Sequence, residues 1–91
     1  MTGTQYELRV TGAAQRQLGR LPERVAAAVV AFVVGPLADR PRAVGHPLRR
    51  ELAGQWSARC GAYRVLYEID DDSSTVIVLR IDHRADIYRP R

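Results

Sequence analysis

The chain has 91 residues, of which 46% are hydrophobic and 26% charged, and this balance excludes an intrinsically disordered protein. We expect residues 1–91 to form a single domain with a thin core, because so short a chain buries only roughly 60 to 65% of the surface that it exposes when unfolded. All 14 basic residues are arginine, and the net charge of +4 favours an acidic partner or a nucleic acid. A GC-rich coding sequence would also replace lysine by arginine, so the positions of the arginines matter more than their number.

Cysteine usage and hydropathy exclude several further classes of protein. The single cysteine, Cys60, cannot form an internal disulfide, and no Cys/His group has the spacing of a zinc or iron–sulfur site. The longest apolar run, residues 25–34, is about half as long as a bilayer crossing requires, and residues 1–10 lack the apolar region of a signal peptide. We therefore expect a cytoplasmic protein with no metal, no cofactor and no membrane contact.

The chain begins with a predicted strand and a short helix. Residues 6–10 alternate in polarity, which places Tyr6, Leu8 and Val10 on the buried face of a strand. Thr11 is a suitable N-cap for a short amphipathic helix that starts near Gly12.

A second helix is predicted from Pro22 to about Leu37, and it would form a helical hairpin with the first helix. Residues 25–34 are apolar on all sides, so this helix must be covered by the sheet, by the first helix or by a partner protein. A buried strand is the alternative, but the length of the run and its three consecutive alanines favour a helix.

The second half of the chain predicts a loop and three strands. Residues 39–47 contain two prolines and a glycine and are expected to form the loop. Strands follow at residues 56–60, 63–69 and 75–81, joined by a tight turn at Gly61 and Ala62 and by a turn at residues 70–74. In the last strand, alternation places Val76, Val78 and Arg80 on one face. The order β-α-α-β-β-β predicts an α+β fold of two layers, with a helical hairpin packed on a mainly antiparallel sheet.

Two arginines on neighbouring predicted strands form the centre of a candidate site. If the hairpin closes at Gly61 and Ala62, Arg59 and Arg64 project near each other, and their repulsion favours an anionic ligand between them. A carboxylate of Glu68, Asp82 or Asp86 could instead neutralise the pair, and the sequence leaves both interpretations open.

Further candidate residues lie at two other places in the chain. His83, Arg84 and Tyr88 are at or after the end of the last predicted strand, and Arg49 and Arg50 come before Arg59. His83 lies beside a strand end and can act as an acid or base near neutral pH, although a lone histidine more often has a structural role. Arg84 is a further phosphate-binding candidate. Tyr88 could stack on a base, assist proton transfer or simply pack on the sheet. Arg49 and Arg50 are expected to follow an RNA phosphate backbone rather than perform chemistry.

Two segments of the sequence resemble the bacterial RelE/ParE toxin superfamily, and RelE-type toxins most closely. These are PLRRELAGQWSARCGAYRVLYEID (residues 47–70) and LRIDHRADIY (residues 79–88), and the similarity runs along almost the whole chain. The shared pattern comprises Leu48, Arg49, Gly54, Trp56, Arg59, Tyr63, Arg64, His83, Arg84 and Tyr88, in this order. The resemblance implies a metal-independent, ribosome-dependent endoribonuclease (an mRNA interferase) that cleaves mRNA in the ribosomal A site. It also implies a cognate RelB-like antitoxin that holds the toxin inactive.

The resemblance implies roles for individual residues. Arg59 and Arg64 match positions that hold the scissile phosphate, His83 matches a catalytic histidine of some relatives, and Tyr88 matches a late tyrosine. Ser57 departs from the pattern, because many RelE-type toxins have lysine or arginine there. His46 precedes Pro47 at a position where a related subgroup carries a glutamate base; we favour an ordinary loop histidine over a compensating one.

Two other functions compete with the nuclease. A ParE-like toxin would have the same fold and would poison DNA gyrase by binding, without nuclease chemistry. A degenerate member of the superfamily would only bind its antitoxin. In each case the apolar second helix and the basic charge predict an antitoxin that supplies an amphipathic helix and acidic residues.

Overall fold

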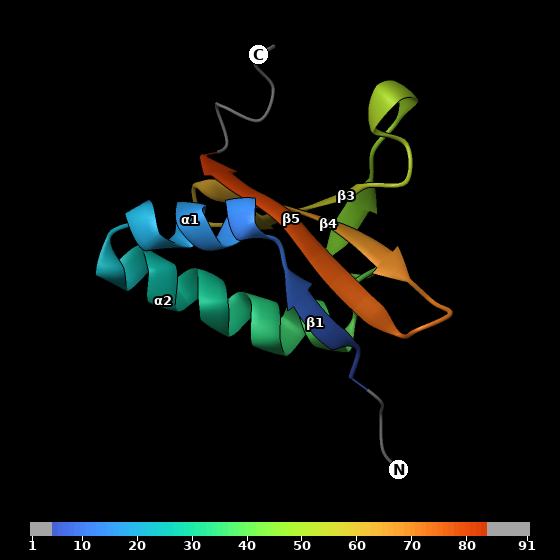
Figure 1. Ribbon diagram of the computed structural model, residues 1–91, viewed down its shortest axis with the longest axis horizontal. Helices are drawn as coiled ribbons and strands as arrows, with labels where there is room; N and C mark the ends of the chain where they lie inside the picture. The colour runs from blue at the N-terminus through green and yellow to red at the C-terminus, as the bar shows by residue number, and fades with distance from the viewer. Residues whose placement is uncertain (1–4, 84–91) are drawn as a thin grey trace.

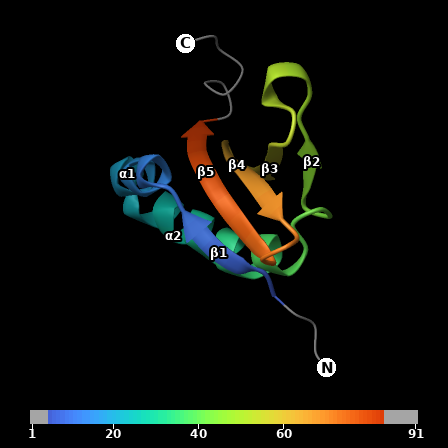
Figure 2. The same ribbon diagram turned by 45° about the vertical axis from the view of Figure 1, so that its right-hand side comes forward.

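The computed structural model describes residues 5–83, which form two helices packed on one side of a five-stranded sheet (Figures 1 and 2). The predicted α+β fold of two layers is confirmed. The strands and main helices are β1 (Glu7–Val10), α1 (Gly12–Arg20), α2 (Glu23–Phe32), β2 (Gly45–Pro47), β3 (Trp56–Cys60), β4 (Tyr63–Asp70) and β5 (Thr75–His83). A π-helical turn, η1 (Val33–Leu37), extends α2, and a 3₁₀ turn, η2 (Arg50–Leu52), lies in the loop before β3.

The two helices begin at the predicted residues. The Thr11 hydroxyl accepts a hydrogen bond from the Ala14 amide at 3.2 Å, as expected of an N-cap residue. Pro22 precedes α2 and Glu23 is in its first turn, where a carboxylate interacts favourably with the helix dipole. Val29, Val33 and Leu37 recur every four residues and are buried against the sheet.

The sheet has the strand order β1-β5-β4-β3-β2, in which β1 pairs with β5 in parallel and the other neighbours are antiparallel. The prediction of an uninterrupted loop at residues 39–47 was wrong, because Gly45–Pro47 forms β2 along the edge of β3. Three residues that include a glycine and a proline carry no alternation pattern, so only their pairing with β3 makes them a strand. Gly45 permits this pairing, since an added Cβ would overlap the Tyr67 hydroxyl.

A β-bulge changes the faces of the last strand. Leu66 is in register with Arg80, but the next residue, Tyr67, is in register with Val78, so Leu79 is the extra residue of β5. The predicted alternation was therefore wrong beyond Val78. Ile81 joins Val76 and Val78 in the core, and Arg80 lies on the opposite face.

The core lies between the helices and the facing side of the sheet. Its buried members are Ala14, Val29, Val33, Leu37, Ala58, Val65, Tyr67, Val76, Val78 and Ile81. Trp56 is partly buried and packs against this cluster. Within residues 5–83, no helix has both the length and the hydropathy to span a membrane.

Candidate active site on the helix-free face

The face of the sheet turned away from α1 and α2, called here the helix-free face, carries the candidate site. Successive side chains of a strand point to opposite faces, and residues in register across strands point to the same face. Ala58 and Val65 are in register and belong to the core, so the neighbouring residues Arg59 and Arg64 project from the helix-free face. The register places further side chains on this face, namely Arg9, His46, Ser57, Leu66, Glu68, Ile77, Arg80 and Asp82.

Arg59 and Arg64 lie directly opposite each other in the β3–β4 pair, as the sequence predicted. Their register is set by the two-residue turn, in which Gly61 adopts the left-handed conformation (φ 61°). Residues opposite each other in an antiparallel pair have Cβ atoms about 4.5–5.5 Å apart, so both guanidinium groups can reach one anion. Asp82 continues this row on β5, in register with Arg64.

A second row on the helix-free face consists of His46, Ser57, Leu66 and Arg80, each in register with the next. Ser57 is buried, and its hydroxyl has no hydrogen-bond partner within residues 5–83. His46 is exposed on β2 beside it. The position of Ser57 on this face therefore holds a small buried hydroxyl flanked by an imidazole.

Arg80 is a further basic residue of this face and is not among the site residues predicted from the sequence. Its Nε and Nη2 atoms each lie 2.7 Å from Oδ2 of Asp82. The sequence signal that could have found it is the spacing of Arg80 and Asp82, two residues apart on one strand and hence on one face.

His83 lies on the other face of the sheet from the arginine pair. It is in register with Tyr63, and the two rings meet edge to face with centroids 5.3 Å apart. Tyr63 lines a pocket of about 310 Å³ between α2 and the β3–β4 hairpin, which confirms that this pair is on the helix side. Arg84 and Tyr88 lie outside the described residues.

Arg49 and Arg50 are exposed in the loop that joins β2 to β3, at the opposite end of β3 from the turn at Gly61. A hydrogen bond of 2.8 Å from the Leu48 amide to the Gln55 carbonyl closes this loop at its base. Arg50 has a positive φ of 59°, a conformation that non-glycine residues seldom adopt. The structure therefore separates these two arginines from the row of Arg59 and Arg64.

The edge strand β2 is fastened to the sheet by a buried tyrosine. The Tyr67 hydroxyl donates a hydrogen bond of 2.5 Å to the Pro41 carbonyl, and burial raises the pKa of Tyr67 to about 12. Arg42 stacks over the Trp56 ring at 5.9 Å from its centroid and forms an ion pair with Asp71. These contacts fix the segment that leads into β2 and so position His46.

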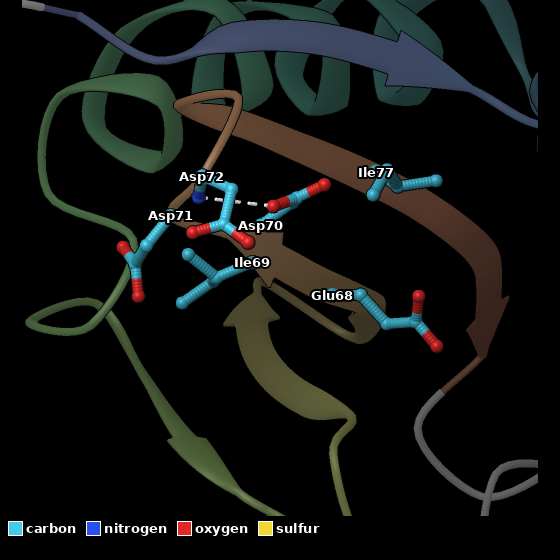
Figure 3. Close-up of a pocket in the computed structure, with 6 residues that line it drawn as sticks. All are labelled: Glu68, Ile69, Asp70, Asp71, Asp72 and Ile77. Atoms are coloured by element: carbon cyan, nitrogen blue, oxygen red, sulfur yellow. Dashed lines mark hydrogen bonds between the residues drawn. The ribbon is translucent and has the colours of Figure 1, made fainter.

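The end of the sheet remote from the arginine pair is acidic. Glu68, Asp70, Asp71 and Asp72 surround an open depression of about 490 Å³ (Figure 3). Asp70 accepts hydrogen bonds from the amides of Asp72 and Ser73, so its carboxylate holds the β4–β5 turn. Among the described residues, no group of three or more His, Cys, Asp or Glu side chains is arranged to hold a metal ion.

Comparisons with known proteins point to one family. The family model of the ParE toxin of type II toxin–antitoxin systems matches residues 8–88. Toxin RelG of Mycobacterium tuberculosis is 60% identical over 84 residues, which cover 92% of this chain and 97% of RelG. Toxin RelE of the same organism is 49% identical, covering 92% of this chain and 87% of RelE. The crystal structure of the RelBE2 toxin–antitoxin complex from M. tuberculosis superposes with a TM-score of 0.86 at 56% identity, covering 89% of this chain and 100% of that chain.

Proposed function

The chain belongs to the RelE/ParE family of type II toxins, and on that premise we propose that it is a ribosome-dependent endoribonuclease that cleaves mRNA in the A site. The observation that carries this proposal is the pairing of Arg59 with Arg64 on the helix-free face. Two guanidinium groups that can both reach one anion suit the phosphate of an RNA backbone, because guanidinium binds phosphate oxygens in a bidentate manner.

The proposed reaction is attack of an RNA 2′-hydroxyl on the adjacent phosphate, which leaves a 2′,3′-cyclic phosphate. This step requires a base for the hydroxyl, cations for the charge that develops on the phosphate, and an acid for the leaving 5′-oxygen. Arg59 and Arg64 are the proposed cations, with Arg84 as a third. Tyr88 is proposed to orient or stack on the base, and Arg49 and Arg50 to hold the RNA or ribosome away from the reacting phosphate.

Two histidines compete for the proton transfer. The resemblance to RelE-type toxins favours His83, whereas the register favours His46, which shares the helix-free face with the arginine pair. His83 is in register with Tyr63 on the helix side. To act on a phosphate held by Arg59 and Arg64, its side chain would have to reach past the end of the sheet to the opposite face. We propose His46 as the acid or base on the side of the arginines and retain His83 as the alternative.

The family resemblance to ParE supports a second candidate, a toxin that binds DNA gyrase and has no nuclease activity. The arginine pair argues for the nuclease, because a toxin that acts only by binding has no need of two cations directed at one anion.

We further propose that the chain is held inactive by a RelB-like antitoxin, as in the RelBE2 complex of its relative. Val30 and Val34 of the second helix segment are 45% and 52% exposed. They line an apolar groove together with side chains of β1, α1, η1 and β5, namely Leu8, Val10, Leu18, Val33, Val78 and Ile81. An amphipathic helix of the antitoxin fits such a groove, since its apolar face would cover the exposed valines.

Cleavage of a defined mRNA on programmed ribosomes, read by primer extension, tests the nuclease proposal. Cuts within the A-site codon that require the ribosome, that leave a cyclic phosphate and that disappear in Arg64→Ala are expected. Intact mRNA together with trapped gyrase–DNA cleavage complexes would establish the gyrase alternative instead. A protein that does neither and still binds its antitoxin would be a degenerate member.

A further inference from the structure

Arg80 occupies a position on the helix-free face that the regular alternation of β5 would not give it. If β5 alternated regularly through Leu79, with no bulge, Arg80 would share a face with Val76 and Val78 and would point into the core. The bulge turns its side chain to the side of Arg59 and Arg64. Bulges near functional sites commonly redirect one side chain in this way.

The position of Arg80 relative to the arginine pair follows from the register. Arg80 is opposite Leu66, and Leu66 is two residues from Arg64 on the same face of β4. Arg64 and Arg80 are therefore diagonal neighbours on adjacent strands, with Cα atoms roughly 7–8 Å apart. This separation lets the two residues contact neighbouring phosphates of one RNA strand.

The Arg80 guanidinium is held in place by a chain of hydrogen bonds that begins on α1. Gln17 accepts a hydrogen bond from the Ile81 amide at 2.7 Å and donates one to Oδ1 of Asp82 at 3.2 Å. Oδ2 of Asp82 in turn binds Nε and Nη2 of Arg80. The Asp82 side chain is only 11% exposed, whereas that of Arg80 is 42% exposed. A nearly buried carboxylate thus orients a cation that reaches solvent.

This arrangement leaves one edge of the guanidinium available. Within residues 5–83 the Arg80 guanidinium donates a hydrogen bond through Nε and forms an ion pair through Nη2, both to Asp82, and Nη1 takes part in neither contact. An arginine fixed along one edge by a carboxylate loses less conformational freedom when its other edge binds a phosphate. The acidic partner therefore serves to orient Arg80 and does not cover it.

We propose that Arg80 is a further RNA-binding residue, positioned by Asp82 and Gln17, that contacts a phosphate next to the one held by Arg59 and Arg64. The inference rests on the proposed nuclease function and adds a second phosphate contact to it. A contact away from the reacting phosphate is made equally in the ground state and in the transition state. It therefore lowers KM and leaves kcat nearly unchanged.

The test measures binding of the purified protein to ribosomes programmed with mRNA whose A-site codon carries 2′-deoxyribose and cannot be cleaved. Wild type is compared with Arg80→Gln, Asp82→Asn and Arg16→Gln, the last being an exposed arginine of α1 that controls for net charge. We expect about tenfold weaker binding for Arg80→Gln and a smaller loss for Asp82→Asn. The slope of log affinity against log salt should be shallower by about 0.7 for Arg80→Gln.

Cleavage of ordinary mRNA by the same variants separates this inference from the proposed function. A raised KM with nearly unchanged kcat for Arg80→Gln, and wild-type values for Arg16→Gln, would support the phosphate contact. Equal affinity and an equal salt slope for Arg80→Gln and wild type would overturn it, even if wild type cleaves mRNA. If wild type cleaves nothing but the salt slope still depends on Arg80, the nuclease proposal fails and the contact stands. Circular dichroism and thermal melting of each variant would identify any loss caused by misfolding.

Discussion

Arg59 and Arg64 face each other across the β3–β4 hairpin, on the side of the sheet that the helices do not cover. Because both side chains can reach one phosphate, we expect their contributions to cleavage to be strongly coupled. Arg59→Gln and Arg64→Gln should each lower kcat by about 10²–10³-fold, and the double variant should lose much less than the product of the two.

A double-mutant cycle of cleavage rates on programmed ribosomes measures this coupling. The matched control cycle joins Arg59→Gln with Arg49→Gln, because Arg49 lies in the loop at the other end of β3. That pair should be additive to within about 0.5 kcal/mol. Additive losses for Arg59 and Arg64 would mean that the two arginines do not bind the same phosphate.

The two faces of the sheet give a direct test of the proton-transfer group. His46→Ala should lower the cleavage rate by about 10²–10⁴-fold if its imidazole is the acid or base beside the arginines. His83→Ala should then have a much smaller effect, because its ring packs against Tyr63 on the helix side. Single-turnover cleavage by the two variants decides between them, and the reverse order of effects would return the role to His83.

The pairing of Arg59 with Arg64 could be predicted because it depends on a local feature, the two-residue turn that fixes the register of a hairpin. The caps of α1 and α2 are local in the same sense, and both helices begin where Thr11 and Pro22 indicated. Interactions between residues that are close together in sequence determine these features of the fold.

The faces of His46 and Arg80 could not be predicted, because they depend on details of strand pairing that the alternation of polarity along each segment does not show. His46 is on the helix-free face only because Gly45–Pro47 pairs with β3 in one register. Arg80 is on that face only because the β4–β5 pair contains a bulge at Leu79. A shift of one residue in either pairing would move the side chain to the other face.

Gly45 is expected to be essential for the position of β2. An added Cβ would lie 2.7 Å from the Ser57 carbonyl oxygen and would overlap the Tyr67 hydroxyl, which is fixed by its hydrogen bond to Pro41. Gly45→Ala should therefore lower the free energy of unfolding by about 1–3 kcal/mol and displace His46.

Urea unfolding at neutral pH measures the cost of Gly45→Ala, and Gly19→Ala in α1 is the matched control. A Cβ at Gly19 would meet no atom within 4 Å, and alanine is the better helix former, so this variant should gain about 0.5–1 kcal/mol. Unchanged stability in Gly45→Ala would show that β2 can move away from β3 without cost.

Tyr67 should make the protein sensitive to alkaline pH. Burial raises its pKa to about 12 in the folded protein, while the phenol of an unfolded chain ionises near the ordinary value of about 10. Between about pH 10 and 12 the unfolded state therefore binds fewer protons than the folded state, and the free energy of unfolding falls as the pH rises.

Tyr67→Phe removes the ionisable hydroxyl and its hydrogen bond to Pro41. The variant should lose about 1 kcal/mol at neutral pH and show a shallower alkaline decline. Urea unfolding of both proteins from neutral pH to about pH 11 provides the measurement, and parallel curves would contradict the assignment.

The apolar groove beside α2 allows the antitoxin proposal to be tested with substitutions that leave the helix-free face unchanged. Val30 is 45% exposed and lines the groove, so Val30→Glu should place a charge against the apolar face of the antitoxin helix. We expect binding to the antitoxin to weaken at least about tenfold, in the range of a hot-spot residue.

Ala27→Glu is the matched control, because Ala27 is exposed on the same helix and does not line the groove. Calorimetric titration with the product of the adjacent open reading frame would give both affinities, while mRNA cleavage by the free variants should stay at the wild-type rate. Equal affinities for the two variants would place the antitoxin helix elsewhere on the toxin.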